Sequence, residues 1–249
     1  MAITAADRIS RIKSYTDQVG PYYGTEDLAV YVYSMIKMTR PQKVLELGTG
    51  LATVSLWAAA ALVENGTGEL VTVDDGSQYA NNSDVVSLLG DQYTADYKAF
   101  VDQQLKLHGV AAVVNFVNKT LEELTFRDSY DMLFADFSHS PFAVTRLLGQ
   151  FLPRITRNST IFIHSASTYY SSYHTLEAVV DLLNQKRIPL SLREMVNPGD
   201  LNRLEQLVNN CVFELTHLVE NKQRNQNSAA QIRIVPCDIV PHPRSNIRF

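Results

Sequence analysis

The chain has 249 residues, 45% of them hydrophobic and 19% charged, which suffices for one sizeable core. A formal net charge of -4 gives no general attraction for a polyanion, so we expect no nucleic-acid partner. The two cysteines, Cys211 and Cys237, lie in apolar strand-like runs without a CxxC pair, which argues against a disulfide scaffold or a cysteine zinc site and predicts two buried thiols.

The N-terminal region reads as two helices. Charges every few residues predict an amphipathic helix over 5–18 instead of a signal peptide. The segment 20–24 (GPYYG) would link it to a helix over 25–39, with Thr25 as its N-cap. No apolar run approaches the roughly 18 residues of a membrane span. We expect a cytoplasmic protein that does not contact membranes.

From Lys43 onward, short β-rich runs alternate with helical ones. This alternation predicts an α/β fold, with a parallel sheet and helices on both of its faces. The expected strands are 43–47, 69–74, 113–118, 130–135, 159–164 and about 188–196. The expected helices are 52–64, 93–107, 141–153 and 173–186.

The C-terminal part changes character. Residues 211–220 and 229–240 predict an antiparallel hairpin at the edge of the sheet, and 241–249 a surface tail. The connection 76–92 is unusually long, as in loops that cover or line a substrate site. We expect one domain over 1–249, with a helical cap (1–40), a core (41–240) and the tail.

The stretch Val44–Trp57, VLELGTGLATVSLW, predicts a strand, a glycine turn and a helix. A dinucleotide-binding GxGxxG motif needs a third glycine, where this chain has Thr53. Glu46 stands two residues before Gly48, where its carboxylate would face the crevice, repel a pyrophosphate and attract a cation. The turn therefore suits S-adenosylmethionine, with its sulfonium and ammonium groups, better than NAD.

Asp74 ends the second strand, 24 residues after Gly50. One carboxylate there can accept hydrogen bonds from both hydroxyls of an adenosine ribose, whether the cofactor is S-adenosylmethionine or NAD. The other interpretation is a strand-ending turn formed by Asp74, Asp75 and Gly76.

Four segments in this order, VLELGTGLATVSLW, ELVTVDDG, VVNFVNKTLEEL and YDMLFADFSHSPFAVTRLL, resemble the class I S-adenosylmethionine-dependent methyltransferases, in their small-molecule O-methyltransferase branch. The resemblance covers roughly residues 25–165. It implies a Rossmann-like, doubly wound, mostly parallel seven-stranded sheet that ends in an antiparallel hairpin, and S-adenosylmethionine as the cofactor.

The resemblance also implies which residues contact the cofactor. Glu46, Gly48, Thr49 and Gly50 would border its methionine end, and Asp136 would lie beside the reacting centre. The ribose would be held at Asp74 and Asp75, and the adenine at Thr120 and Leu121. Lys119 stands where the family often has an acidic or small polar residue, and a lysine cannot accept a hydrogen bond from the adenine amino group.

Methyl transfer needs alignment and one base for the acceptor's proton. His139 and His164 follow strands of the predicted sheet and titrate in the right range, although either could instead be structural. The resemblance implies a possible divalent ion held by Asp136 and an Asp-Asn pair, but the chain has His164-Ser165 there. We expect no metal; the alternative is a transition metal on Asp136, His139 and His164.

Several tyrosines and a phenylalanine favour a small, partly apolar organic acceptor with an oxygen nucleophile. These residues are Tyr22, Tyr23, Phe137, Tyr169 and Tyr170. The alternatives are an N-, RNA or protein methyltransferase, a nicotinamide oxidoreductase, and a non-catalytic S-adenosylmethionine-binding protein. By analogy with the family, the chain could form a homodimer.

Overall fold

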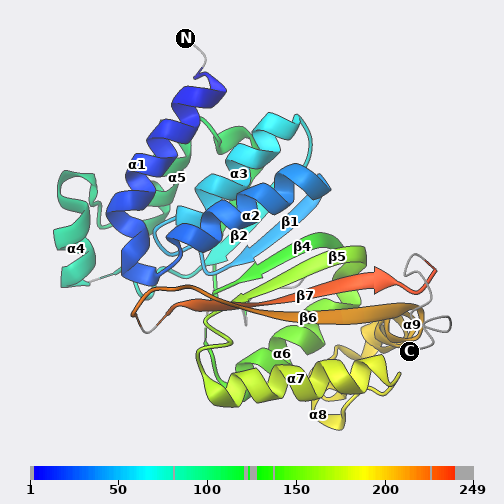
Figure 1. The fold of residues 1–249 in the computed structure, drawn as a ribbon. Helices are drawn as coiled ribbons and strands as arrows, with labels where there is room; N and C mark the ends of the chain where they lie inside the picture. Colours follow the sequence, from blue (N-terminus) through cyan, green and yellow to red (C-terminus); the bar gives the residue numbers. More distant parts are fainter. Residues whose placement is uncertain are drawn as a thin grey trace. The chain divides into compact units, whose positions relative to one another are not determined.

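The computed structural model describes residues 3–80, 82–120, 123, 128–136, 138–224 and 226–238 (Figure 1). The chain forms two compact units. The first comprises residues 1–126, 132–137 and 221–227, and the second residues 127–131, 138–220 and 228–249. Among the described helices, none is long and apolar enough to cross a bilayer.

The fold is α/β, as the sequence predicts. The strands in the described part of the chain form a seven-stranded sheet in the order β3-β2-β1-β4-β5-β7-β6. The C-terminal strands are antiparallel and the first four are parallel, which confirms the predicted Rossmann-like class.

In the first unit, β1 (Lys43–Leu47) pairs in parallel with β2 (Glu69–Asp74) and with β4 (Tyr130–Ala135). Strand β3 (Val114–Asn118) pairs in parallel with β2. Because parallel strands end at the same edge, the residues that follow β1, β2, β3 and β4 are brought to one edge of this sheet.

Helices of the first unit pack on these strands. Helix α3 (Thr53–Asn65) is buried almost throughout and contacts β2, α1 (Ala5–Tyr23) and α2 (Glu26–Thr39). Helix α5 (Tyr97–Leu107) contacts β3. The long connection 76–92 contains α4 (Ser83–Leu89), capped by Asn82, and the 3-10 turn Gly90–Gln92. A second 3-10 turn, Ala111–Val113, precedes β3.

Helix α1 runs five residues beyond its predicted end. The segment 20–24 is not a separate link, because Pro21 and both tyrosines are helical and Gly24 ends the helix at φ 71°. The Gly24 N–H donates to the Gly20 carbonyl, which completes a left-handed cap. Thr25 is the N-cap of α2, as predicted, but its hydroxyl makes no capping hydrogen bond.

In the second unit, β7 (Ser228–Pro236) pairs antiparallel with both β5 (Ile155–His164) and β6 (Cys211–Val219). Helix α7 (Tyr170–Asn184) packs against β6, and α6 (Pro141–Phe151) contacts α7 and α8 (Leu190–Arg193). Helix α9 (Leu201–Asn210), absent from the sequence-based prediction, contacts β6. The 3-10 turns Leu152–Arg154 and Pro198–Asp200 precede β5 and α9.

The strand predicted over 188–196 is wrong. Alternation would place Leu190 and Leu192 on one face, but Leu190 is 71% exposed and Leu192 fully buried. Leu192 is the buried residue of the helical turn α8, and Val196 is buried three residues beyond the end of that turn. Without this segment, the described strands agree with the seven that the family resemblance implies.

The prediction of two buried thiols is half right. Cys211 is buried at the start of β6, whereas Cys237 is exposed because β7 ends one residue earlier, at Pro236. Both thiols are free. The predicted tail, 241–249, lies outside the described residues.

Candidate cofactor site and histidine pair

The glycine turn after β1 has the backbone that its sequence demands. Gly48 and Gly50 have φ angles of 94° and 53°, which side-chain-bearing residues rarely adopt. A Cβ atom at Gly48 would lie 2.0 Å from the carbonyl oxygen of Asp136, whose N–H donates to Leu47 at the end of β1. Gly48 therefore lets the chain after β4 pass directly against the turn, and it brings Asp136 to the predicted site.

Asp74 binds the same turn. Its carboxylate accepts a hydrogen bond from the Gly50 N–H (2.9 Å) and another from the Gly76 N–H (2.7 Å). Burial raises the pKa of Asp74, and these two hydrogen bonds oppose that rise. Two parts of the predicted site, the glycine turn and the end of β2, are thus joined through one carboxylate.

Glu46 differs from its prediction. The carboxyl group does not face a crevice, since the residue is 1% exposed. Oε2 accepts from the hydroxyls of Ser55 and Thr72, and Thr72 is itself 2.6 Å from the hydroxyl of Thr49. Oε1 is buried without a hydrogen-bond partner among the residues that the structure describes. Burial raises the pKa of Glu46 to about 8, against the effect of both hydroxyls.

This pKa weakens the electrostatic argument made from the sequence. Near neutral pH, a carboxyl group with a pKa of about 8 is mostly protonated. Glu46 therefore carries little of the negative charge with which we expected it to attract a cation. Instead, its carboxyl group links the end of β1 to Ser55 of α3 and to Thr72 of β2 through hydrogen bonds.

The end of β3, which precedes the residues predicted for the adenine end, lies beside Asp74. Asn118 and Lys119 donate to the Asp74 carbonyl, at 2.9 and 3.2 Å. The N–H and hydroxyl of Thr120 are bound by Glu123. Asp75 is exposed and accepts from the Ser77 N–H, which is the turn that the alternative interpretation predicts. Leu121 lies outside the described residues.

Three tyrosines surround the glycine turn, and sequence reasoning missed two of them. The hydroxyl of Tyr97 donates to the Gly50 carbonyl (2.9 Å), and that of Tyr15 to the Leu51 carbonyl (2.8 Å). Burial raises the pKa of both hydroxyls, so they stay protonated donors. Tyr23 packs its ring against Gly50. Tyr15 and Tyr97 fit the amphipathic patterns of their helices. The sequence therefore does not indicate that their hydroxyls bind the glycine turn.

The second unit holds the two candidate bases. His164 ends β5 and is 1% exposed, while His139 is half-buried before α6. Their ring centroids are 6.4 Å apart, edge to face. His139 also stacks on Tyr169 at 5.1 Å, and Ser172 donates to its carbonyl. The structure therefore brings together the two histidines that the sequence singled out.

The structure describes four of the five residues predicted to line the acceptor site, two in each unit. Tyr22 and Tyr23 meet edge to face at 4.8 Å in the first unit. Tyr169 and Tyr170 are 40% and 79% exposed in the second, and Phe137 lies outside the described residues. Among the described side chains, no group of three or more His, Cys, Asp or Glu could hold a metal ion.

Comparison with known proteins agrees with this fold. Residues 45–166 match a family model described as a methyltransferase domain. This confirms the resemblance to the class I methyltransferases drawn from the sequence. No curated protein sequence matches the chain significantly.

Solved structures with low sequence identity share the fold. The O-methyltransferase TomG from Streptomyces achromogenes, involved in tomaymycin synthesis and solved in complex with SAM, is 14% identical at a TM-score of 0.52. That alignment covers 90% of this chain and 89% of TomG. An O-methyltransferase from Bacillus cereus, in complex with SAH, is 11% identical at 0.52, with 90% of each chain covered. SAH-bound PaMTH1 from Podospora anserina is 12% identical at 0.50, covering 92% of this chain and 88% of that one.

Proposed function

We propose that this methyltransferase transfers the methyl group of S-adenosylmethionine to an oxygen atom of a small, partly apolar organic acceptor. The family match over 45–166 supports methyl transfer, and the fold shared with SAM- and SAH-bound structures supports the donor. When bound, the donor supplies a methyl group on a positively charged sulfur that leaves as a neutral thioether. The chain then has to position both reactants and accept one proton.

The observation that carries the proposal is the position of Asp74 at the glycine turn. Its carboxylate can only accept hydrogen bonds, so it matches a pair of ribose hydroxyls. The two glycine N–H groups hold it at the end of β2, next to Asn118 and Lys119 at the end of β3. The described residues therefore fit the ribose of the donor.

The acceptor's proton would go to an imidazole nitrogen of His139 or His164. His139 is half-buried and is therefore more accessible to an acceptor than the buried His164. The two imidazole rings meet edge to face. We propose that no metal takes part, because His164 and Ser165 replace the hard oxygen ligands that magnesium or calcium prefers.

Removing the carboxylate tests the cofactor site. We expect Asp74→Ala to weaken binding of S-adenosylhomocysteine roughly 100-fold or more, because two hydrogen bonds to a charged group are lost. Titration calorimetry measures the change, and circular dichroism checks that the variant is folded. The matched control is Asp102→Ala, since Asp102 on α5 has an exposed carboxylate paired with Lys98. Wild-type affinity in Asp74→Ala would remove Asp74 from the ribose site.

The base is tested by pH dependence. We expect kcat/KM of the wild type to rise with pH, because only the neutral imidazole can accept the acceptor's proton. Glutamine in place of the acting histidine, His139 or His164, should lower kcat roughly 100- to 10,000-fold and abolish this rise. His174→Gln is the control, because His174 is an exposed partner of Glu177 on α7. If both single variants keep the wild-type profile, the base assignment is wrong.

A further inference from the structure

Tyr23 occupies a position that the sequence did not single out for cofactor binding. It is the last residue of α1, and a Cβ atom placed on Gly50 would lie 3.2 Å from its ring. Its pKa is raised by burial first, then by Tyr22 and by the carboxylates of Asp74 and Asp136. The ring therefore packs on the glycine turn, at Gly50, whose N–H binds the Asp74 carboxylate.

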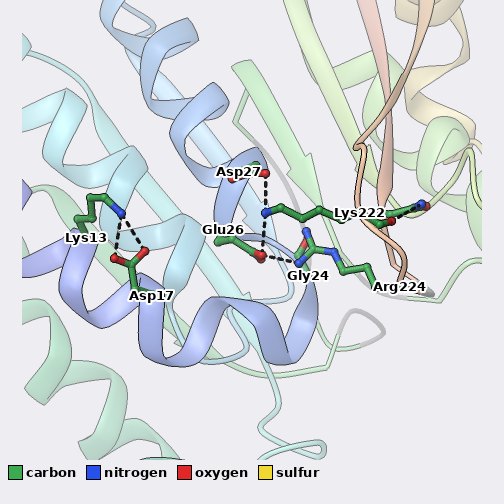
Figure 2. A network of polar contacts seen from close by, with 8 residues as sticks. Lys13, Asp17, Gly24, Glu26, Asp27, Lys222 and Arg224 are labelled. Atoms are coloured by element: carbon green, nitrogen blue, oxygen red, sulfur yellow. Dashed lines mark hydrogen bonds and ion pairs between the residues drawn. The ribbon is translucent and has the colours of Figure 1, made fainter.

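A group of charged residues holds the chain next to Tyr23, and we call it the clamp: Glu26 and Asp27 of α2 with Lys222 and Arg224 (Figure 2). Oε1 of Glu26 lies 2.5 Å from the Arg224 guanidinium and 3.0 Å from the Lys222 ammonium. Lys222 also reaches Asp27, at 2.6 Å. Burial would raise the pKa of Glu26, but the hydrogen bonds from Arg224 and Lys222 prevail and lower it, so Glu26 is charged.

The clamp acts on Gly24, the residue that follows Tyr23. The Arg224 guanidinium donates to the Gly24 carbonyl at 3.1 Å. A Cβ atom at Gly24 would lie 2.3 Å from the carbonyl oxygen of Gln226. The chain at Gln226 therefore packs so closely against the cap of α1 that only glycine fits at position 24. Since the side chains of Arg224 and Glu26 are only 18% and 15% exposed, solvent screens this ion pair less than a surface pair.

We propose that Tyr23 is a residue of the donor site whose ring contacts the positively charged sulfur of S-adenosylmethionine, and that Arg224 positions Tyr23 through Gly24. This inference rests on the proposed function. A cation is attracted to the face of an aromatic ring, and the Asp74 carboxylate, which binds the same glycine turn, adds to that attraction. The edge contact with Tyr22, which accepts a hydrogen bond from Asn82, supports the ring.

The charge of the ligand gives a direct test. S-adenosylmethionine carries a positive sulfur, and S-adenosylhomocysteine has a neutral one in otherwise the same framework. We expect Tyr23→Leu to weaken binding of S-adenosylmethionine roughly tenfold more than binding of S-adenosylhomocysteine, in the range of a partly desolvated cation–π contact. Tyr23→Phe, which keeps the ring, should retain the wild-type ratio of the two affinities.

Arg224→Ala tests the positioning role. It should shift the same affinity ratio in the same direction, by about threefold, because a displaced ring keeps part of the contact. It should also increase amide hydrogen exchange of residues 20–25, which does not depend on any ligand. The control is Lys13→Ala, which removes the exposed ion pair of Lys13 with Asp17 on α1 and should change neither reading (Figure 2).

The outcomes separate the two proposals. If the wild type binds neither ligand, the proposed function fails. If the wild type binds both and Tyr23→Leu weakens them equally or not at all, the contact between Tyr23 and the sulfur is refuted while the proposed function stands. If Arg224→Ala alters neither the affinity ratio nor the exchange of 20–25, the positioning role of Arg224 is refuted.

Discussion

Glu46 is a buried acid whose protonation is coupled to folding. Its pKa is about 8 in the folded protein, against an ordinary value of 4.5, mainly because burial disfavours the charged form. Between these two values the folded state holds a proton that the unfolded state has released. The contribution of Glu46 to stability is therefore complete below pH 4.5 and declines as the pH rises towards 8.

The variant Glu46→Gln keeps an oxygen for Ser55 and Thr72 but has no proton to lose. We expect the free energy of unfolding of the wild type to fall relative to the variant as the pH rises from 5 to 8, by up to about 1.4 kcal/mol per pH unit. Urea denaturation across this interval measures both proteins. Parallel pH profiles would show that Glu46 does not titrate in that range.

Single residues show what local sequence can and cannot reveal. The positive φ angles of Gly48 and Gly50 and the position of Asp74 follow from a motif of neighbouring residues, and the structure has them as the motif implies. The burial of Glu46 depends on Ser55 and Thr72, which the motif does not specify. Tyr15 meets Leu51 from 36 residues away, a contact without a local signal.

At the scale of elements, the turn between β1 and α3 lies at the edge where the parallel strands β1, β2 and β4 end. Gly48→Ala would place a methyl group 2.0 Å from the Asp136 carbonyl oxygen and strain the backbone, whose φ is 94°. Gly66→Ala is the matched control, since Gly66 has φ 69° but nothing within 4 Å of a Cβ atom. We expect Gly48→Ala to lose about 1–3 kcal/mol more stability than Gly66→Ala, as overpacking does.

Thermal or urea denaturation of the two variants measures this difference. Both substitutions place alanine at a positive φ, so the difference reports the close approach of Asp136 to the turn together with the larger φ of Gly48. Equal losses would mean that the chain after β4 moves aside freely, and that Asp136 is not fixed against the turn.

The elements that sequence patterns predict well are those with local signals. Strands β1, β2 and β4 have the predicted bounds, because each is a short apolar run between clear turns. The segment 188–196 has the composition of a strand, but tertiary packing buries Leu192 in the helical turn α8. The predicted link over 20–24 does not form, since α1 continues through Pro21 and ends at the Gly24 cap.

At the scale of the molecule, family resemblance supplied what periodicity could not. It implied seven strands, which the described sheet has, whereas the chain's own pattern added a strand over 188–196. The antiparallel end follows from both. The clamp joins Glu26 to Arg224 across 198 residues, and nothing in either local sequence foretells that pairing. The single-domain organisation, the cytoplasmic location and the homodimer stay predictions.

Transfer of a methyl group from S-adenosylmethionine to an oxygen is the proposed activity of this chain. The direct measurement is to incubate the purified protein with methyl-labelled S-adenosylmethionine and matched aromatic acceptors that offer a hydroxyl, an amine or neither, and to follow the label. We predict label on the hydroxyl-bearing acceptor, with S-adenosylhomocysteine released in equal amount. Label on the amine alone, or bound donor with no transfer to any acceptor, would contradict the proposed transfer to oxygen.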